Sequence, residues 1–501
     1  MMRADHLACA GNPLVKTPNL DRLASQGVLF TRSYCSNPIC MPARASMFTG
    51  LMPRDHGVRV NGHVLRSDLP TLPGVLSTAG YHTHAAGKLH LSPWVPMVEP
   101  PDPAAYPECL QYWRDGIVER FPLPYFGFQT VDLVGGHGDY VYGHYIQWLR
   151  EQGGSPEMLA RTNPLERPGG AGDCCKMSVP PEWHYNRYIS DSTIRVIQEA
   201  SGKGQPFFAW CSYPDPHPPI APPAPYYDMY RPDDIALPPR DEEEVGKLPP
   251  YYAQVLAGKS RPTGNSNVGI SDADWREMTA LTYGMVSHID DEVGRVMDAL
   301  RRLGLTDSTL VVFLGDHGNM LGAHGLIFKG AYTFRECINI PTIVASPGAM
   351  AGVVSDALVS QIDLLPSVLD FCKVPMPGSD WANKETRFER GSLMPLDPYP
   401  GRSWMDLLEG ASSAVRDTVV IEDDDVETGY RVRCLVTQRY RLAIYPGTPY
   451  GELFDLENDP RELHNLWDCP EMKPLKSELV GRLLDAYSLS TPFHPIPPWN
   501  S

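Results

Sequence analysis

Several side chains that can take part in catalysis follow directly after apolar segments of this sequence. In an open α/β sheet, ligands bind beyond the carboxyl ends of the strands, so side chains at these points are expected to converge. One thiol, two lysines, one arginine, three histidines and one aspartate would form a cationic, metal-assisted pocket suited to a tetrahedral oxyanion. These residues are Cys40, Arg44, Lys88, His90, His217, Asp316, His317 and Lys329.

The elements that must position these residues alternate between helix and strand. Thr17 and Pro18 open a helix as N-cap and first helical residue, and Ser271 caps the longest periodic helix, which is predicted to end near Leu303. This alternation predicts an α/β fold with a large mixed, mostly parallel sheet between layers of helices. Strands are predicted at 28–34, 80–86, 206–211 and 308–314, and further helices at 42–48, 72–79, 140–152 and 190–200.

The pattern changes after about residue 365. Short strands are predicted at 419–422, 431–436, 440–445 and 452–456, followed by a helix at 475–487. The sequence therefore predicts a catalytic α/β domain over residues 1–365. A smaller α+β subdomain, with an antiparallel sheet and a helix, is predicted over residues 366–501.

Composition excludes some classes of partner. The 501 residues include 60 acidic side chains against 43 Lys and Arg, a net charge of −17, which disfavours binding to nucleic acids or anionic membranes. No apolar run approaches the roughly 18 residues that a membrane span needs. Eleven scattered cysteines favour a reducing compartment such as the cytoplasm, whereas a periplasmic or secreted location stays open because the start looks truncated.

One segment allows a more specific interpretation. Cys40-Met41-Pro42-Ala43-Arg44, followed by Thr49-Gly50, resembles the signature of the sulfatase family, and further segments resemble that family's motifs in its own order. The resemblance covers most of the chain except 91–180 and 220–265, and it implies an alkaline-phosphatase-like fold. The further segments are TPNLDRLASQGVLF, GKLH, PHPP, GDHGNMLGAHGLIFKG and GELFDLENDPRELHNL.

The resemblance implies a nucleophile and a metal. A formylglycine-generating enzyme would convert Cys40 to formylglycine, whose hydrated aldehyde attacks the ester. Cys40, Asp316 and His317 would hold a divalent cation, with calcium favoured and manganese or magnesium as alternatives. The substrate would be a small-molecule or saccharide sulfate ester.

The resemblance also implies roles for the other residues. Arg44 would orient the hydrated aldehyde, and Lys88 and Lys329 would bind the sulfate oxygens. His217 would protonate the leaving oxygen, and His90 would take a proton from the second hydroxyl so that sulfate is expelled.

The beginning of the chain departs from the family pattern. Family members have a strand that ends in one or two metal-binding Asp residues just before the segment that starts at Arg3. We therefore expect this first strand and its carboxylates to be missing from the given sequence. Asp5 lies beyond the family position and is not assigned as a ligand.

Two alternative functions stay open at this point. The same pocket would suit a phosphonate or phosphate ester hydrolase, because sulfate and phosphate esters share tetrahedral geometry. An inactive relative that only binds anions is the other alternative, since N-terminal metal ligands are missing. His324 is equally compatible with substrate contact and loop packing, whereas His137, Asp139 and the Cys174–Cys175 pair are expected to be structural. The sequence does not predict the oligomeric state.

Overall fold

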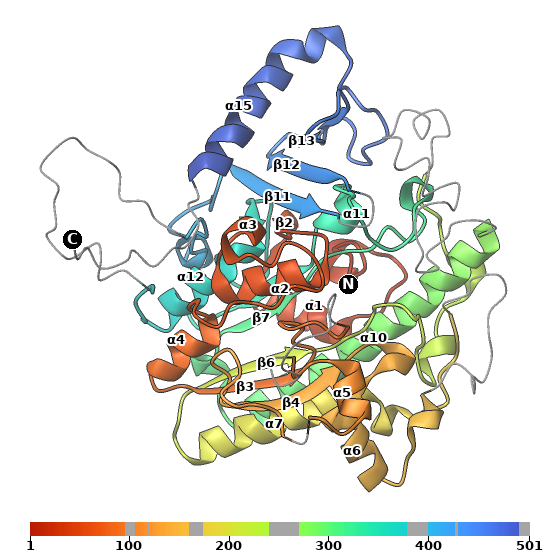
Figure 1. Cartoon of the computed structure of the whole chain (residues 1–501), viewed down its shortest axis with the longest axis vertical. Coiled ribbons are helices and arrows are strands. Elements are labelled where there is room, and N and C mark those ends of the chain that lie inside the picture. The colour runs from red at the N-terminus through yellow and green to blue at the C-terminus, as the bar shows by residue number, and fades with distance from the viewer. Residues whose placement is uncertain are drawn as a thin grey trace, which may run out of the picture.

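The strands of this computed structural model form three four-stranded sheets and one short two-stranded pair (Figure 1). The structure describes residues 1–95, 106–118, 120–159, 174–239, 270–377, 399–425 and 429–489. The predicted α/β fold with a separate C-terminal sheet is confirmed. The short pair consists of β2 (Ser33–Tyr34) and β10 (Val359–Ser360).

The first sheet has the order β5-β4-β3-β6. Its central strand β3 (His82–Gly87) runs parallel to β4 (Thr130–Gly135) and β6 (Phe207–Ser212), while β5 (Tyr142–Gly143) is antiparallel to β4. Because three of these strands point the same way, the loops that follow them begin at one edge of the sheet.

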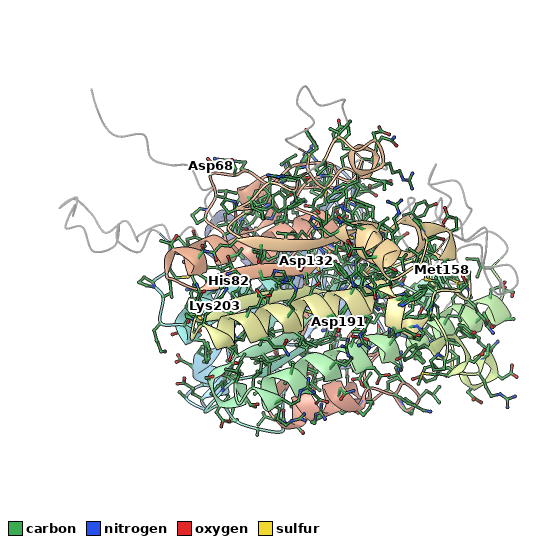
Figure 2. The ribbon with its side chains drawn as sticks, turned by 90° about the horizontal axis from the view of Figure 1, so that it is seen from below. Asp68, His82, Asp132, Met158, Asp191 and Lys203 are labelled. Carbon is green, nitrogen blue, oxygen red and sulfur yellow. The ribbon has the colours of Figure 1, made fainter. Side chains whose placement is uncertain are left out.

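Helix α7 (Tyr185–Gly202) covers one face of this sheet and packs against the long helix α10 (Asp272–Arg302) (Figure 2). Arg195 of α7 forms a 2.6 Å ion pair with Asp132 of β4. On the side of α7 toward α10, Asp191 pairs with Arg295. These ion pairs tie the strand layer to both helices.

The second sheet has the order β7-β8-β1-β9. Strand β8 (Thr342–Ala345) is antiparallel to β1 (Val28–Phe30) and β7 (Val311–Leu314), and β9 (Val353–Ser355) is parallel to β1. The predicted cap of α10 is present as a capping box between Ser271 and Asp274.

The remaining helices are short, apart from the last one, and half of them fall where helices were predicted. The strand predicted at 28–34 is divided between β1 and β2. The helices not yet named are α1 (Pro18–Ser25), α2 (Cys40–Thr49), α3 (Pro53–His56), α4 (Leu72–Thr78), α5 (Leu110–Arg114), α6 (His144–Glu151), α11 (Arg335–Ile338), α12 (Leu364–Phe371), α14 (Met405–Leu408) and α15 (Lys473–Leu489).

The C-terminal sheet is an antiparallel meander, as predicted. Leucines of its strands pack against Leu479 and Leu483 of α15. The boundary predicted at residue 365 falls inside α12 and stays a prediction. The four strands are β11 (Thr418–Asp424), β12 (Arg431–Thr437), β13 (Tyr440–Ile444) and β14 (Gly451–Asp455).

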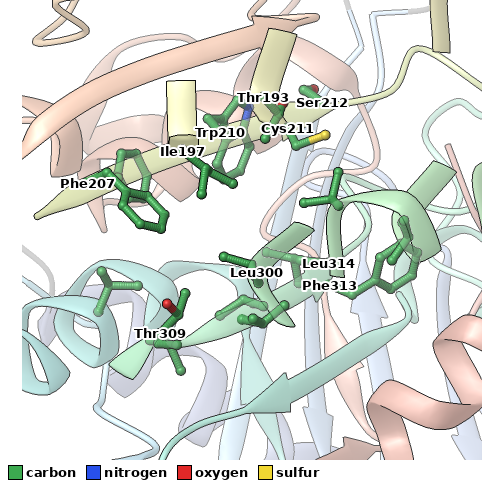
Figure 3. Close-up of a pocket in the computed structure, with 18 of the residues that line it drawn as sticks. Thr193, Ile197, Phe207, Trp210, Cys211, Ser212, Leu300, Thr309, Phe313 and Leu314 are labelled. Carbon is green, nitrogen blue, oxygen red and sulfur yellow. The ribbon is translucent and has the colours of Figure 1, made fainter. Parts of the chain in front are cut away.

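A cavity of about 670 Å³ separates the first two sheets, and β6 and β7 are the sheet edges that line it (Figure 3). The strand predicted at 206–211 is present as β6. Its apolar residues indicate a buried strand, but the Phe207–Cys211 part of β6 is only half-buried beside this cavity. The expected additional strand ahead of Met1 stays a prediction.

The family resemblance does not cover the stretches 91–180 and 220–265, and parts of them lie outside the described residues, namely 96–105, 119, 160–173 and 240–265. Among the described helices, none combines the length and apolarity needed to cross a bilayer. All eleven cysteines are free thiols.

Candidate active site

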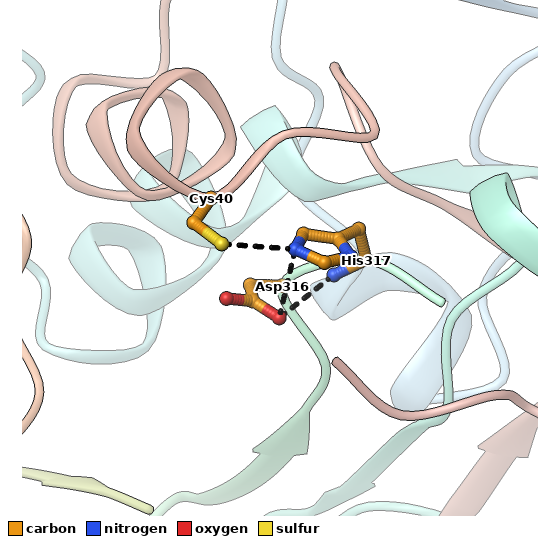
Figure 4. A group of neighbouring side chains, drawn as sticks. All are labelled: Cys40, Asp316 and His317. Carbon is orange, nitrogen blue, oxygen red and sulfur yellow. Dashed lines mark hydrogen bonds and ion pairs between the residues drawn. The ribbon is translucent and has the colours of Figure 1, made fainter. Parts of the chain in front are cut away.

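Cys40 is the first residue of α2 and its side chain is buried, with 2% of the residue exposed. Gly50 ends this helix with a φ of +67°, a left-handed conformation that favours glycine and explains the Thr-Gly pair of the motif. Cys40 Sγ lies 3.2 Å from His317 Nε2 (Figure 4). It also lies 2.6 Å from Lys329 Nζ. Burial raises the pKa of the Cys40 thiol, but the charges of Lys329 and Lys88 outweigh burial and lower this pKa well below its ordinary value.

Asp316 and His317 follow β7 directly. Asp316 Oδ1 accepts hydrogen bonds from the Met1 amino group at 2.8 Å and from the His317 backbone N–H at 3.0 Å. Asp316 Oδ2 accepts one from Arg44 Nε at 3.1 Å. Burial opposes ionisation, but the neighbouring positive charges of the Met1 amino group and Arg44 lower the pKa of Asp316 well below its ordinary range. The carboxylate is therefore ionised.

Arg44 joins three parts of the site. Its Nη1 donates to the backbone oxygen of Lys88 at 2.7 Å and to Ser212 Oγ at 2.9 Å, in addition to the contact with Asp316. One guanidinium thus fixes the ends of β3, β6 and β7 relative to α2. This explains how the ends of strands from two separate sheets are held in fixed positions around Cys40.

Lys88 is almost fully buried at the end of β3, with 1% exposed. Its Nζ lies 3.2 Å from His137 Nε2 and 5.0 Å from the centre of the Trp94 ring. Burial lowers the pKa of Lys88 to about 8. The ammonium is therefore mostly charged at pH 7 and loses its proton with a modest rise in pH.

The two histidines assigned to proton transfer are buried. His90 stacks on Trp94 at 4.0 Å, and Glu108 holds its loop by accepting the backbone N–H groups of His90, Leu91 and Ser92 at 2.6–3.0 Å. His217 Nδ1 donates to the Pro218 carbonyl at 2.6 Å. Burial lowers the pKa of both histidines to about 3, so both rings are neutral before an anion enters.

Lys329 contacts three of the other predicted side chains. Its Nζ lies 2.6 Å from Cys40 Sγ, 3.1 Å from His317 Nε2 and 3.2 Å from His217 Nε2. All eight residues predicted for the site therefore lie in one connected cluster, although they are spread over 290 positions of the sequence.

His324, for which the sequence left two alternatives, packs within its loop. Its ring stacks on Phe334 at 3.8 Å and lies 3.9 Å from Glu336. No contact between His324 and the eight site residues is found in the described part of the chain. These observations favour loop packing.

His137 was expected to be structural, and the structure places it inside the site instead. Its ring stacks on His217 at 3.4 Å with an interplanar angle of 4°, and its Nε2 faces Lys88. The signal that sequence reasoning overlooked is its position, two residues after an apolar strand that ends in Gly135. Strand ends of this kind were the criterion used for the other site residues.

Comparison with known proteins identifies the family. Residues 1–374 match the family description Sulfatase, and residues 388–488 match N-sulphoglucosamine sulphohydrolase, C-terminal. The chain belongs to the sulfatase family. The resemblance found in the sequence is thereby confirmed, and the chain is a hydrolase with an alkaline-phosphatase-like fold.

This sulfatase is similar along nearly its whole length to proteins of known name. It is 27% identical to an arylsulfatase of Clostridium perfringens, over 98% of this chain and 97% of that protein. It is also 27% identical to the multifunctional alkaline phosphatase superfamily protein PehA of Trinickia caryophylli, over 97% and 91%. Among solved structures, the phosphonate monoester hydrolase of Agrobacterium radiobacter superimposes with a TM-score of 0.79 at 26% identity, covering 98% of this chain and 94% of that one.

The sulfatase site has side chains that fit a divalent cation. Ligand atoms of Cys40, Asp316 and His317 all lie within 4.8 Å of one another. His317 Nδ1 donates to the Gly318 carbonyl at 2.9 Å, which leaves the Nε2 lone pair directed toward Cys40. The Lys329 ammonium contacts both Cys40 Sγ and His317 Nε2, so these two atoms are directed toward a cationic group.

Proposed function

We propose that this protein hydrolyses sulfuric esters of aryl, alkyl or sugar groups, with formylglycine formed from Cys40 as the nucleophile. The observation that carries the proposal is the setting of Cys40, which is buried between Lys329 and His317 with Arg44 and Lys88 nearby. Relatives named arylsulfatase, choline-sulfatase and N-acetylglucosamine-6-O-sulfatase support sulfate as the group removed.

Cys40, Asp316 and His317 would hold the divalent cation, which supplies Lewis-acid stabilisation of a negatively charged oxygen. Carboxylate ligation favours calcium, and the imidazole ligand also suits manganese. The hydrated aldehyde supplies two hydroxyl groups on one carbon, so that one attacks and the other allows release. A formylglycine-generating enzyme is the partner that this maturation requires.

The residues of the chain then have separable tasks. Lys88 and Lys329 neutralise the ester oxygens, and Arg44 keeps the position of Asp316 relative to α2. His217 Nε2, already 3.2 Å from Lys329 Nζ, is the atom placed to carry a proton to the leaving oxygen. His90, stacked on Trp94 and adjacent to Cys40, is the base for the second hydroxyl.

The test combines mass spectrometry with two substrates. The protein is expressed together with a formylglycine-generating enzyme, and the peptide that contains Cys40 is weighed. We expect a loss of about 18 Da relative to the thiol peptide, the mark of thiol-to-aldehyde conversion. We also expect faster hydrolysis of nitrophenyl sulfate than of phenyl phosphonate esters. An unmodified thiol together with the absence of hydrolysis would favour the inactive anion-binding relative.

A second candidate function is phosphonate monoester hydrolysis on the same site. The observation that favours it is the likeness to the phosphonate monoester hydrolase of Agrobacterium radiobacter, over 98% of this chain. The cationic residues suit both esters, since both present tetrahedral anionic oxygens. A kcat/KM for phenyl phosphonate above that for nitrophenyl sulfate would establish this candidate and overturn the sulfatase assignment of substrate.

A further inference from the structure

A second group of buried ligand-type side chains lies outside the eight residues described above. It consists of His184, Asp215 and His288, whose ligand atoms all lie within 4.8 Å of one another. Their exposed fractions are 0%, 4% and 1%. They come from three elements: His184 precedes α7, Asp215 lies in the loop after β6, and His288 lies in the middle of α10.

The histidines of this group have nitrogen atoms without hydrogen-bond partners. Among the described residues, no partner is found for either ring nitrogen of His288 or for Nε2 of His184. Buried polar atoms are nearly always hydrogen-bonded, so three such atoms around one carboxylate need an explanation. Tyr226 stacks on the His288 ring at 4.4 Å and fixes its plane without satisfying either nitrogen.

Asp215, by contrast, is firmly oriented. Its Oδ1 accepts the Tyr185 hydroxyl at 2.5 Å, and its Oδ2 accepts Asn186 Nδ2 at 2.9 Å. Each carboxylate oxygen has further lone pairs, so these bonds leave room for a metal ligand bond. Hydrogen bonds that orient a ligating carboxylate are typical of the surroundings of metal sites.

We propose that His184, Asp215 and His288 bind one divalent transition-metal ion, for which zinc is the best fit. Two imidazoles and one carboxylate are a donor set that zinc accepts, with water as a fourth ligand. At ligand distances of about 2.0–2.2 Å, the side chains need to approach one another by at most about 1.5 Å. His184 Nδ1 accepts the Asn186 N–H at 3.2 Å, so binding through Nε2 moves the ring proton to Nδ1 and gives up this long bond.

The position of the site suggests what the ion does. Asp215 is two residues before His217, whereas His184 is the N-cap residue of α7 and His288 lies within α10. The ion ties the loop that carries His217 to α7 and α10. Its role is to position that loop, and the site is independent of the reaction proposed for Cys40.

In the test, the protein is first stripped of metal with a chelator and is then incubated with zinc. Its zinc content is measured by elemental mass spectrometry. The test is done with Asp316→Ala, so that the site around Cys40 does not contribute. We expect one zinc per chain, and replacement by Co²⁺ should produce the strong visible absorption of a low-symmetry, four-coordinate ion. His288→Phe keeps the stacking on Tyr226 and should lower zinc affinity at least tenfold.

His324→Phe is the matched control, because His324 is a buried histidine outside both groups, and this variant should keep its zinc. Asp215→Asn, whose amide oxygen can still accept one of the two hydrogen bonds of Asp215, is the second test variant if His288→Phe does not fold. Circular dichroism establishes that each variant is folded. Zinc content that stays at one in both test variants, or that is zero in the Asp316→Ala protein, would overturn the proposal.

Discussion

Two buried clusters of charge in this protein differ in how their charges are balanced. In the C-terminal sheet, the Arg441 guanidinium lies between the carboxylates of Glu452, at 2.7 Å, and Glu462. All three are at most 1% exposed. Around Cys40, three cationic side chains, Arg44, Lys88 and Lys329, face a single carboxylate, Asp316, and the Cys40 thiolate, which the proposed maturation removes.

The difference separates a structural cluster from a reactive one. Buried charges are tolerated where each has an opposite partner, and a charge left alone is strongly destabilising. In the C-terminal cluster the single guanidinium lies between two carboxylates, so its positive charge is fully partnered within the chain. The cluster at Cys40 carries excess positive charge, and an incoming anion such as a sulfate ester would supply the missing negative charge.

The largest expected effect is on stability, in the C-terminal cluster. Arg441→Met should lower the free energy of unfolding by about 3–5 kcal/mol, because two buried carboxylates lose their cation. Urea denaturation measures this change. Arg441→Lys is the matched control and should recover part of the loss. If Arg441→Met unfolds at the wild-type urea concentration, the ion pairs of Arg441 are not the stabilising feature inferred here.

The corresponding change in the cluster around Cys40 should impair catalysis without lowering stability. Lys329→Met should lower kcat/KM for nitrophenyl sulfate by about 10²–10³-fold, because a cation that stabilises the transition state is lost. The free energy of unfolding should stay the same or rise, since an uncompensated charge is removed. Steady-state kinetics and urea denaturation on the same preparation give both values. Wild-type kinetics in this variant would contradict the placement of Lys329.

The pH dependence of Lys88 offers a finer test of the excess positive charge. Burial lowers its pKa to about 8, so the ammonium that binds the anion is lost as the pH rises through that value. The thiolate of Cys40 raises the pKa of Lys88. Conversion of Cys40 to formylglycine removes this thiolate, so the deprotonation of Lys88 should then occur below pH 8. We expect kcat/KM to fall about tenfold per pH unit above the transition. Lys88→Arg should remove this fall, because a guanidinium does not titrate in this range.

The smallest expected effect concerns His137, which supports the cluster without carrying charge. Its ring stacks on His217 at 3.4 Å, so His137→Ala should loosen His217 and lower kcat by about tenfold. His137→Phe retains a flat ring and should keep most of kcat. Equal losses in the two variants would mean that the contact with Lys88, rather than the stacking, is what matters.

Local signals explain which parts of the fold were predictable. Helix α10 was predicted to within a residue at each end, because a capping box and regular apolar spacing both depend on neighbours in the sequence. The burial of β6 was predicted wrongly, because an apolar strand has the same sequence pattern whether it lies inside a sheet or at a sheet edge beside a cavity. His137 was missed because the aromatic, proline-rich stretch around it has no clear period.

The sequence by itself determined the family, the alternation of helix and strand, and the eight side chains that meet at Cys40, because motif spacing and strand ends are local properties. Only the tertiary structure decided that His137 joins this site, that His324 packs elsewhere, and that His184, Asp215 and His288 form a second group. These three lie on separate elements up to 104 positions apart, and such distances become short only when helices pack on sheets.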